Sequence, residues 1–454
     1  MTISKTDLPL HAVLERIHQA RGTINDANSF EGEIVALLAL EDGKLLLGIQ
    51  LEDAFVLARV TSDLELDTSF GADHSGYVWD LFDDADWGYS AVYGLLRQDD
   101  HILLTGEYFD FREYRSRAAL ARYTKDGIVD TGFADDGKLV IELPEARQAN
   151  RRGILHHARQ ILTKATQPAP AGQVTLVGDK IVIVLLDATF DNSNGTTQLI
   201  RLNNDGSFDL GFNGQGFVHV TVGGREINPG GVRVLANECL LVYGGTQPAD
   251  DGAYAVLARY TTDGSPDPSF NATISPGFIA IGEAGLRARF GALHEDQGQV
   301  FALGDISGDG LMAHIQSDGT PAPDFNDGIP LRFPLPGNTL DKLHAVQPQR
   351  SHLVAAGSVY PSGGRRGLVM RLTRAGELDA EFAGGAGFSV DPQPSEYFDV
   401  AISPEETILT GGYCNEHTAL KDHGTHGLTA QDLGKNSSAS TEFRATPARK
   451  SRRA

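Results

Sequence analysis

The residues best suited to binding chemistry form an acidic and aromatic group between residues 83 and 89. Three carboxylates, Asp83, Asp84 and Asp86, stand beside Trp87 and Tyr89. Aromatic rings stack on sugar rings and carboxylates accept hydrogen bonds from hydroxyls, so this group could bind a carbohydrate; the same carboxylates could hold a cation. Turn chemistry favours the competing interpretation, a solvated acidic turn with an internal tryptophan.

A second group, between residues 108 and 115, interleaves aromatic and basic residues. Its candidate binding residues are Tyr108, Phe109, Arg112, Tyr114 and Arg115. Tyr and Arg are enriched at the energetic centres of protein interfaces, so this composition is typical of a protein-binding loop. Aromatic residues in a hairpin that only lengthens a sheet would give the same pattern, and the sequence leaves both interpretations open.

Two oxygen-rich segments, 203–209 and 305–310, resemble fragments of calcium loops. A loop of the EF-hand type needs a bidentate acid at its last position, and counting from Asp305 that position holds Gln316. Ordinary turns therefore explain both segments better. Cys414, His417, His423 and His426 match no closed zinc pattern, and we expect them to be exposed. We accordingly expect no metal and no cofactor, with calcium as the alternative.

Enzyme signatures are missing from the sequence. It has no Gly-x-Ser-x-Gly elbow, no phosphate-binding loop and no His-Glu-x-x-His. Scattered carboxylates cannot be paired into a general acid and a general base from sequence alone. We therefore expect no catalytic residue and favour a protein without catalysis, which binds a carbohydrate or a protein. The alternative is a hydrolase or lyase that acts on glycans with acidic residues at a rim or in a central channel.

A repeat positions these groups. An arginine on an apolar strand is followed eight residues later by an aspartate and then, after three more, by a phenylalanine. A sixth copy has His314 and Ala322 in place of the arginine and the aspartate. Because both are lost together, and because an unpaired buried charge costs roughly 3–5 kcal/mol, we interpret them as structural ion pairs rather than catalytic groups. The predicted pairs are Arg59 and Asp67, Arg122 and Asp130, Arg201 and Asp209, Arg259 and Asp267, and Arg371 and Asp379.

Each repeat contains four short β-rich runs separated by Gly, Asn, Asp and Pro, which predicts a small antiparallel sheet. Runs that are apolar on both faces, such as 181–186, must be covered on both sides. Radial stacking provides this cover, so we predict an all-β protein, a β-propeller of four-stranded blades. The first hairpin recurs seven times but the arginine strand six times, which favours seven blades. Residues 1–30 would then supply a closing strand for the last blade, or a short helix.

The repeat resembles that of the bacterial delta-sixty repeat family. Ala258-Arg259-Tyr260, Asp263-Gly264-Ser265, Asp267 and Phe270 match its pattern closely, and the copies extend from residue 31 to about 392. The resemblance implies a propeller-like body. It implies no activity and no catalytic set, because the family has no general activity to transfer.

Three parts follow along the chain. Residues 1–30 precede the propeller repeats, which occupy residues 31–415. The repeats contain an insertion at 144–172 whose apolar residues have helical spacing and whose polar side is basic. Residues 416–454 form a polar, basic tail that we expect to be disordered. In a propeller, the Asp-Gly turns and hairpin turns lie on one rim. The variable connections lie on the opposite rim, which we expect to carry function.

Charge narrows the class of partner. The chain has 60 acidic and 38 basic residues and a formal net charge of −22. Such a body repels nucleic acid and anionic membranes, so we expect neither as partner, and we expect a monomer. No N-terminal apolar segment and no membrane-length apolar run is present, which predicts a soluble protein, cytoplasmic unless it is exported without a cleavable N-terminal signal.

Overall fold

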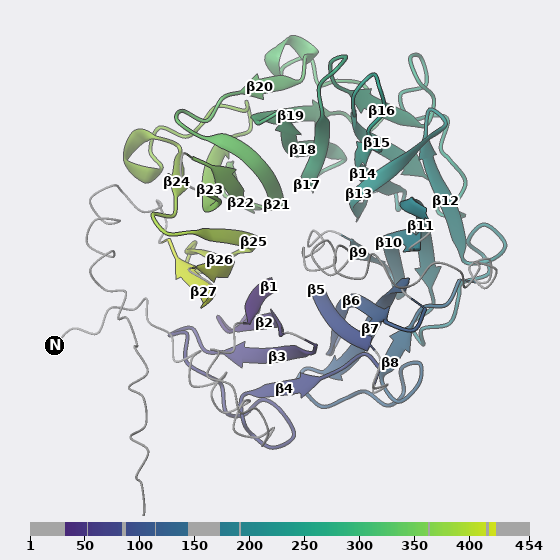
Figure 1. The fold of residues 1–454 in the computed structure, drawn as a ribbon, viewed down its shortest axis with the longest axis vertical. Coiled ribbons are helices and arrows are strands. Elements are labelled where there is room, and N and C mark those ends of the chain that lie inside the picture. Colours follow the sequence, from purple (N-terminus) through teal and green to yellow (C-terminus); the bar gives the residue numbers. More distant parts are fainter. Residues whose placement is uncertain are drawn as a thin grey trace, which may run out of the picture.

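The chain forms a ring of radially arranged antiparallel sheets (Figure 1). The structure is a computed structural model that describes residues 32–51, 53–83, 88–113, 115–143, 173–189, 192–361, 364–414 and 417–423. Within these residues seven blades follow one another in sequence order, which confirms the predicted all-β propeller. Residues 1–30, the insertion 144–172 and the tail beyond residue 423 lie outside the described residues.

The first three blades have four strands each. Blade 1 consists of β1 (Glu33–Ala39), β2 (Leu45–Gln50), β3 (Phe55–Val60) and β4 (Tyr77–Asp80); blade 2 of β5 (Gly88–Gln98), β6 (His101–Asp110), β7 (Arg115–Thr124) and β8 (Lys138–Val140); and blade 3 of β9 (Val174–Val177), β10 (Lys180–Thr189), β11 (Asn192–Leu202) and β12 (Phe217–Val222). In each blade the four strands pair antiparallel in sequence order, from the axis outward.

Blades 4 to 6 repeat this order, and the described residues give blade 7 three strands. Blade 4 consists of β13 (Arg225–Val234), β14 (Leu240–Thr246), β15 (Ala255–Tyr260) and β16 (Phe278–Ile281); blade 5 of β17 (Ala288–Asp296), β18 (Gln299–Ile306), β19 (Asp309–Ile315) and β20 (Leu331–Phe333); blade 6 of β21 (Thr339–Gln349), β22 (His352–Tyr360), β23 (Arg366–Thr373) and β24 (Phe388–Val390); and blade 7 of β25 (Ser395–Ile402), β26 (Ile408–Cys414) and β27 (His417–Asp422). Two short 3-10 turns, Asn326–Gly328 and Ala383–Gly385, precede the outermost strands of blades 5 and 6.

Blade 7 corrects one prediction. The sequence after residue 412 lacks the arginine strand, so the propeller was expected to end at residue 415. Instead β27 pairs with β26 from Cys414 opposite His417 to Leu409 opposite Asp422. A strand pairs through backbone groups, so it forms here without the side chains that mark the repeat.

The core lies between the blades rather than within a single layer. Seven apolar clusters of described residues join neighbouring blades, and an eighth lies within blade 2. The cluster that joins blade 7 to blade 1 contains Ala401 and Leu409 together with Ile34 and Leu47, and β1 packs against β25 and β26. The ring is therefore closed by packing between the last blade and the first, which explains why strands such as β3 and β14 are buried on both faces.

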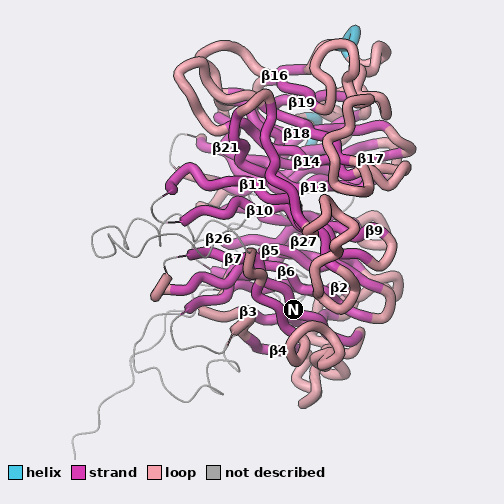
Figure 2. Tube along the Cα trace, turned by 90° about the vertical axis from the view of Figure 1, so that its right-hand side faces the viewer, coloured by secondary structure: helices cyan, strands magenta, loops and turns pink. Residues whose placement is uncertain are grey.

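The two faces of the ring differ in their connections. Figure 2 shows the strands crossing the thickness of the ring, with the connections gathered at its two sides. Because the strands are antiparallel, the turns between first and second strands and the connections between third and fourth strands share one side, which we call the turn face. Loops between second and third strands and the connections between blades share the other side, which we call the loop face.

The repeated arginine links each blade to the next on the turn face. Arg259 Nε donates to Asp267 Oδ2 at 2.8 Å, its guanidinium lies 4.7 Å from the centre of the Phe270 ring, and Nη1 donates to the carbonyl of Ser317 in blade 5. The phenylalanine contacts the turn of the next blade, since a Cβ on Gly319 would lie 2.7 Å from the Phe270 ring. One motif thus fixes its own turn and a neighbouring blade.

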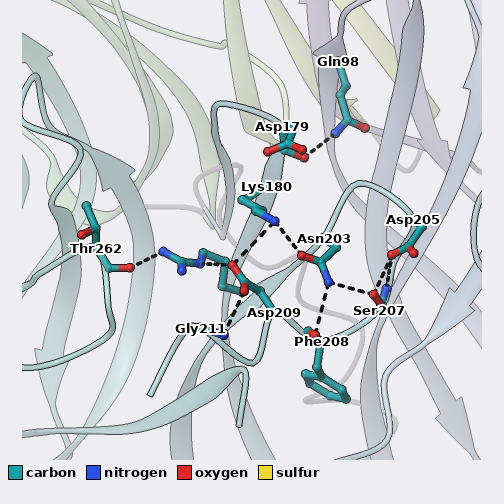
Figure 3. A network of polar contacts seen from close by, with 11 residues as sticks. Gln98, Asp179, Lys180, Asn203, Asp205, Ser207, Phe208, Asp209, Gly211 and Thr262 are labelled. Atoms are coloured by element: carbon teal, nitrogen blue, oxygen red, sulfur yellow. Dashed lines mark hydrogen bonds and ion pairs between the residues drawn. The ribbon is translucent and has the colours of Figure 1, made fainter. Parts of the chain in front are cut away.

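All five predicted ion pairs form in the structure. The Nε to Oδ2 distances are 2.8 Å for Arg59 and Asp67, 2.7 Å for Arg122 and Asp130, 2.9 Å for Arg201 and Asp209, 2.8 Å for Arg259 and Asp267, and 2.5 Å for Arg371 and Asp379. Figure 3 shows the copy in blade 3, where Asp209 also contacts Lys180 and the carbonyl of Thr262 in blade 4 accepts a hydrogen bond from Nη1 of Arg201.

The copy in blade 5 replaces the pair with different contacts. His314 Nε2 hydrogen-bonds to Gln299 Oε1 at 2.8 Å, and its ring stacks on Phe301. From blade 6, Arg374 forms an ion pair with Asp296 and lies over the same Phe301 ring. The connection between blades 5 and 6 therefore persists, with the arginine supplied from the opposite side.

A buried aspartate adds a hydrogen bond to the packing between blades 7 and 1. Asp399 Oδ2 accepts a hydrogen bond from the backbone N–H of Leu37 in β1, and Oδ1 accepts one from the backbone N–H of Val400, each at 2.8 Å. In the other blades with the same inner-strand bulge the corresponding residue is Ala or Gly: Ala36, Gly94, Gly231, Ala292 and Ala345. Burial raises the pKa of Asp399 to about 7.

This pKa predicts a pH-dependent stability. The folded protein binds the Asp399 proton more tightly than the unfolded chain does. The stabilisation that this proton gives the folded state is therefore fully present below about pH 4 and is lost as the pH rises through about 7. Between pH 5 and pH 7.5 we expect wild type to lose about 2 kcal/mol of unfolding free energy relative to Asp399→Asn, measured by urea unfolding. Parallel pH profiles for the two proteins would contradict this expectation.

Candidate functional site

The inner hairpins place a set of polar residues at one level around the axis. Six innermost strands contain a bulge whose extra residue is Val35, Tyr93, Gly230, Gly291, His344 or Phe398. The residue two positions before the bulge stands near the loop face, opposite a residue of the second strand. We call these pairs the polar belt: Glu33 and Gln50, Ala91 and Glu107, Asn228 and Gly245, Arg289 and Asp305, Lys342 and Ser358, and Glu396 and Tyr413.

A glycine in the second strand makes this arrangement possible. In five blades a Cβ on this glycine would lie 1.8 to 2.3 Å from the carbonyl oxygen of the belt residue on the first strand, at Gly106, Gly244, Gly304, Gly357 and Gly412. No side chain fits at such distances, so the bulged strand can approach only glycine. In blades 2, 5, 6 and 7 the next residue is polar and belongs to the belt.

In blades 5 to 7 the belt becomes a continuous charged network. Arg289 Nε donates to Asp305 Oδ1 at 2.7 Å, and Nη2 donates to the Asp341 carbonyl of the next blade at 2.6 Å. Arg365 bridges two carboxylates, with Nε 3.0 Å from Asp341 Oδ2 and Nη1 2.7 Å from Glu396 Oε2. Arg289, Asp305, Asp341, Lys342, His344, Ser358, Arg365 and Glu396 form what we call the three-blade network.

Carboxylates lie beneath the cations in this network. The side chains of Glu396, Asp305 and Asp341 are 5, 14 and 17% exposed, whereas those of Arg365 and Arg289 are 23 and 41% exposed. Glu396 also accepts from His344 Nε2 at 2.9 Å, and Ser358 Oγ donates to Asp341 Oδ2 at 3.1 Å. The acids therefore orient Arg289 and Arg365, which are more exposed to the solvent than the acids are.

Burial shifts two pKa values within the network in opposite directions. It raises the pKa of Asp305, although the guanidinium of Arg289 opposes the shift. It lowers the pKa of Lys342, and the neighbouring Arg289 and Arg365 add to this effect. For Glu396 burial acts upward, but His344 and Arg365 prevail and the pKa is lowered. Perturbed groups of this kind concentrate at functional sites.

The predicted residues of the 83–89 group are only partly placed. Asp83 is exposed on the loop face, while residues 84–87, which include Asp84, Asp86 and Trp87, lie outside the described residues. Tyr89 is buried, stacks on Phe109 and contacts Glu107, whose pKa is raised by burial. Tyr89 therefore belongs to the blade rather than to an open sugar-binding surface.

The 108–115 group differs from the interface interpretation. Tyr108, Phe109 and Arg115 are buried because β6 continues to Asp110 and β7 begins at Arg115, so the hairpin lengthens the blade. Arg112 is exposed and pairs with Asp110 at 3.3 Å. Tyr114 lies outside the described residues. The alternative interpretation, a sheet-lengthening hairpin, describes these residues.

The oxygen-rich segments hold arginine and lysine rather than open ligand positions. Asp209 contacts Arg201 and Lys180, Asp305 contacts Arg289, and Asp309 Oδ2 accepts from Arg332 at 2.7 Å. Among the described residues no group of three His, Cys, Asp or Glu could hold a metal ion. His423, expected to be exposed, is instead buried and bonds to Thr410 at 2.8 Å, because β27 ends beside it.

No helix in the described part of the chain is long and apolar enough to span a membrane.

The three-blade network was not predicted, because its members come from strands about fifty residues apart in sequence. A signal for it exists in the repeat: a polar residue directly after the second-strand glycine, as in Gly304-Asp305 and Gly357-Ser358.

Comparison with known proteins finds similarity at low sequence identity. No curated protein matches the chain. Solved structures that resemble it include prolyl oligopeptidase B from Galerina marginata (10% identity, 94% of this chain and 54% of the other, TM-score 0.42), the Dos1 propeller (10%, 88% and 95%, 0.41) and polysaccharide lyase Uly1 (11%, 90% and 95%, 0.44). The chain spans about half the length of the oligopeptidase. These similarities concern the fold alone.

A family model described as a β-propeller domain of unknown function, DUF5122, matches residues 97–133, 180–212 and 240–270. Each matched segment ends at the phenylalanine of the arginine motif: Phe133, Phe212 and Phe270. The match thus covers the second and third strands of blades 2, 3 and 4 and the turn that follows them. In these three blades the chain carries the repeat of a β-propeller domain whose function is unknown.

Proposed function

We propose that this protein is a recognition propeller without catalysis, which binds a carbohydrate or protein partner through the loop face. The observation that carries the proposal is the three-blade network, in which buried carboxylates orient solvent-facing cations across blades 5, 6 and 7. Preorganised polar groups on a rigid scaffold are typical of binding sites. The resemblance to the bacterial delta-sixty repeat family is part of the same proposal, since such repeats supply a scaffold.

The two faces support this division of roles. On the turn face the repeated arginine, aspartate and phenylalanine contact one another and the next blade, so their chemistry is used within the fold. On the loop face Tyr360 exposes 44% of its surface at the end of β22, and the guanidinium of Arg365 lies 5.4 Å from the centre of its ring. An exposed ring beside oriented charges is a surface that a ligand can contact.

A substitution of Tyr360 tests the proposal. Tyr360→Ala removes the exposed ring and its contact with Arg365, while the ion pairs of Arg365 with Asp341 and Glu396 do not involve Tyr360. We expect at least a tenfold loss of affinity for the ligand found on a glycan array or by pull-down. Arg97→Ala serves as the control, because Arg97 is half-exposed on the turn face, forms an ion pair with the exposed Glu41 and donates to the carbonyl of Asp99. Equal losses in both variants, or none in Tyr360→Ala, would argue against the loop face.

An enzyme that acts on glycans is the second candidate. Asp305, with a raised pKa, and Lys342, with a lowered pKa, have the properties of a general acid and a general base within one network. Asp305→Asn distinguishes the two functions. Loss of turnover with binding preserved would favour the hydrolase or lyase, whereas binding without turnover in wild type favours recognition.

A further inference from the structure

We propose that the three-blade network is a subsite for an acidic saccharide, whose anionic group is held by Arg289 and Lys342 while a sugar ring packs on Tyr360. This inference rests on the proposed function and specifies its ligand. The three residues lie on adjoining segments: Arg289 donates to the carbonyl of Asp341, the residue before Lys342, and Tyr360 pairs with Thr339 at the start of the same strand.

The layering of charge favours an anionic ligand. Asp305, Asp341 and Glu396 are less exposed than Arg289 and Arg365 and already accept hydrogen bonds from Arg289, Arg365, Ser358 or His344. An incoming ligand would therefore meet the guanidinium of Arg289 before it meets a carboxylate. Guanidinium groups recognise carboxylate and sulfate by bidentate hydrogen bonds.

The net charge of the chain sharpens this argument. At a formal net charge of −22 the body repels anions at long range. The cations of the three-blade network, which buried acids orient, therefore differ from the negative potential that the rest of the chain produces. We expect binding to weaken as salt is added, because the attraction comes from a few partly exposed charges.

The distribution of apolar surface favours a saccharide over a protein. Among the described residues five large hydrophobic side chains are exposed, and four of them, Ile128, Leu210, Ile274 and Ile329, follow third strands on the turn face. The fifth is Tyr360, on the loop face. Protein interfaces bury an apolar centre, which this set does not offer around the network, whereas a single exposed aromatic ring beside charged groups suits a sugar.

The state of Lys342 gives an independent readout. Burial and two guanidinium groups lower the pKa of its ammonium group. An anion placed beside it would raise that pKa again, so binding should be coupled to proton uptake at alkaline pH. Calorimetry in buffers of different ionisation enthalpy measures this uptake, and Lys342→Met should abolish it while keeping the aliphatic stem.

The experiment compares matched oligosaccharides with wild-type protein and three variants. Neutral, uronic-acid-containing and sulfated oligosaccharides of equal length are titrated into the full chain. We expect the acidic sugars to bind at least tenfold more tightly than the neutral ones, and Lys342→Met and Arg289→Gln each to remove most of this preference. Arg97→Gln, on the turn face, should keep it. Thermal unfolding of each variant checks that the blades remain intact.

The outcomes separate this inference from the proposed function. Neutral and acidic sugars bound equally, or a preference that survives in folded Lys342→Met, would overturn the acidic subsite while leaving carbohydrate recognition in place. Capture of a protein alone, lost in Tyr360→Ala, would overturn the saccharide but keep recognition by the loop face. A preference for uronate over sulfate, or the reverse, with proton uptake that depends on Lys342, supports the inference and identifies the anionic group.

Discussion

Asp267→Ala is expected to lower the free energy of unfolding by about 3 kcal/mol or more. Its partner Arg259 is 4% exposed, and the 2.8 Å bond to Asp267 is one of three that hold its guanidinium. Removing the carboxylate leaves a buried positive charge whose remaining contacts, a serine hydroxyl, a carbonyl and the Phe270 ring, are all uncharged. Urea unfolding, followed by circular dichroism, measures the loss.

The chain itself suggests the control. Blade 5 lacks both members of the pair and has His314 and Ala322 instead. The double variant Arg259→His/Asp267→Ala places these two residue types in blade 4, where it removes the unpaired positive charge as well as the carboxylate. We expect it to be more stable than Asp267→Ala alone. If the double variant were the less stable of the two, the aspartate would have a role beyond neutralising the arginine.

The fold could be predicted from sequence because the sequence patterns that indicate it are local and repeated. Each arginine motif lies within twelve residues, and each blade within about sixty, so one copy explains the next. Blade 7 was the exception: β27 forms from residues 417–422, which carry no trace of the repeat. Edge pairing with β26 requires only backbone groups, and a prediction that rests on side-chain patterns cannot detect it.

The candidate site was harder to predict for a physical reason. Aromatic and charged residues in a loop, such as Tyr89, Tyr108 and Arg115, look available for binding until the strand ends are known. Here β6 and β7 extend far enough to bury all three. Arg289, Lys342 and Glu396, in contrast, occupy inner strands of three successive blades. They meet only because equivalent strand positions converge at the axis of the ring, and distance along the chain conceals this convergence.

The largest effect at the site itself is expected from Gly304→Ala. The new Cβ would lie 1.8 Å from the carbonyl oxygen of Arg289 and 2.8 Å from the Cα of Phe290. Both are backbone atoms, so no side-chain rotation can relieve the clash and the bulged strand must move. We expect a loss of about 3 kcal/mol in unfolding free energy, the upper part of the range for overpacking.

Gly211→Ala is the matched control, because the added Cβ on this exposed turn would meet side chains alone, the Asp209 carboxylate at 3.2 Å and the Arg201 guanidinium at 4.0 Å. There we expect a change below about 1 kcal/mol. The two variants should also differ in their effect on ligand binding. The peptide displaced by Gly304→Ala carries Arg289 and adjoins Asp305, so binding to the loop face should fall together with stability, while Gly211→Ala should leave it unchanged. Full affinity in a destabilised Gly304→Ala would mean that the bulge shapes the blade without positioning the three-blade network.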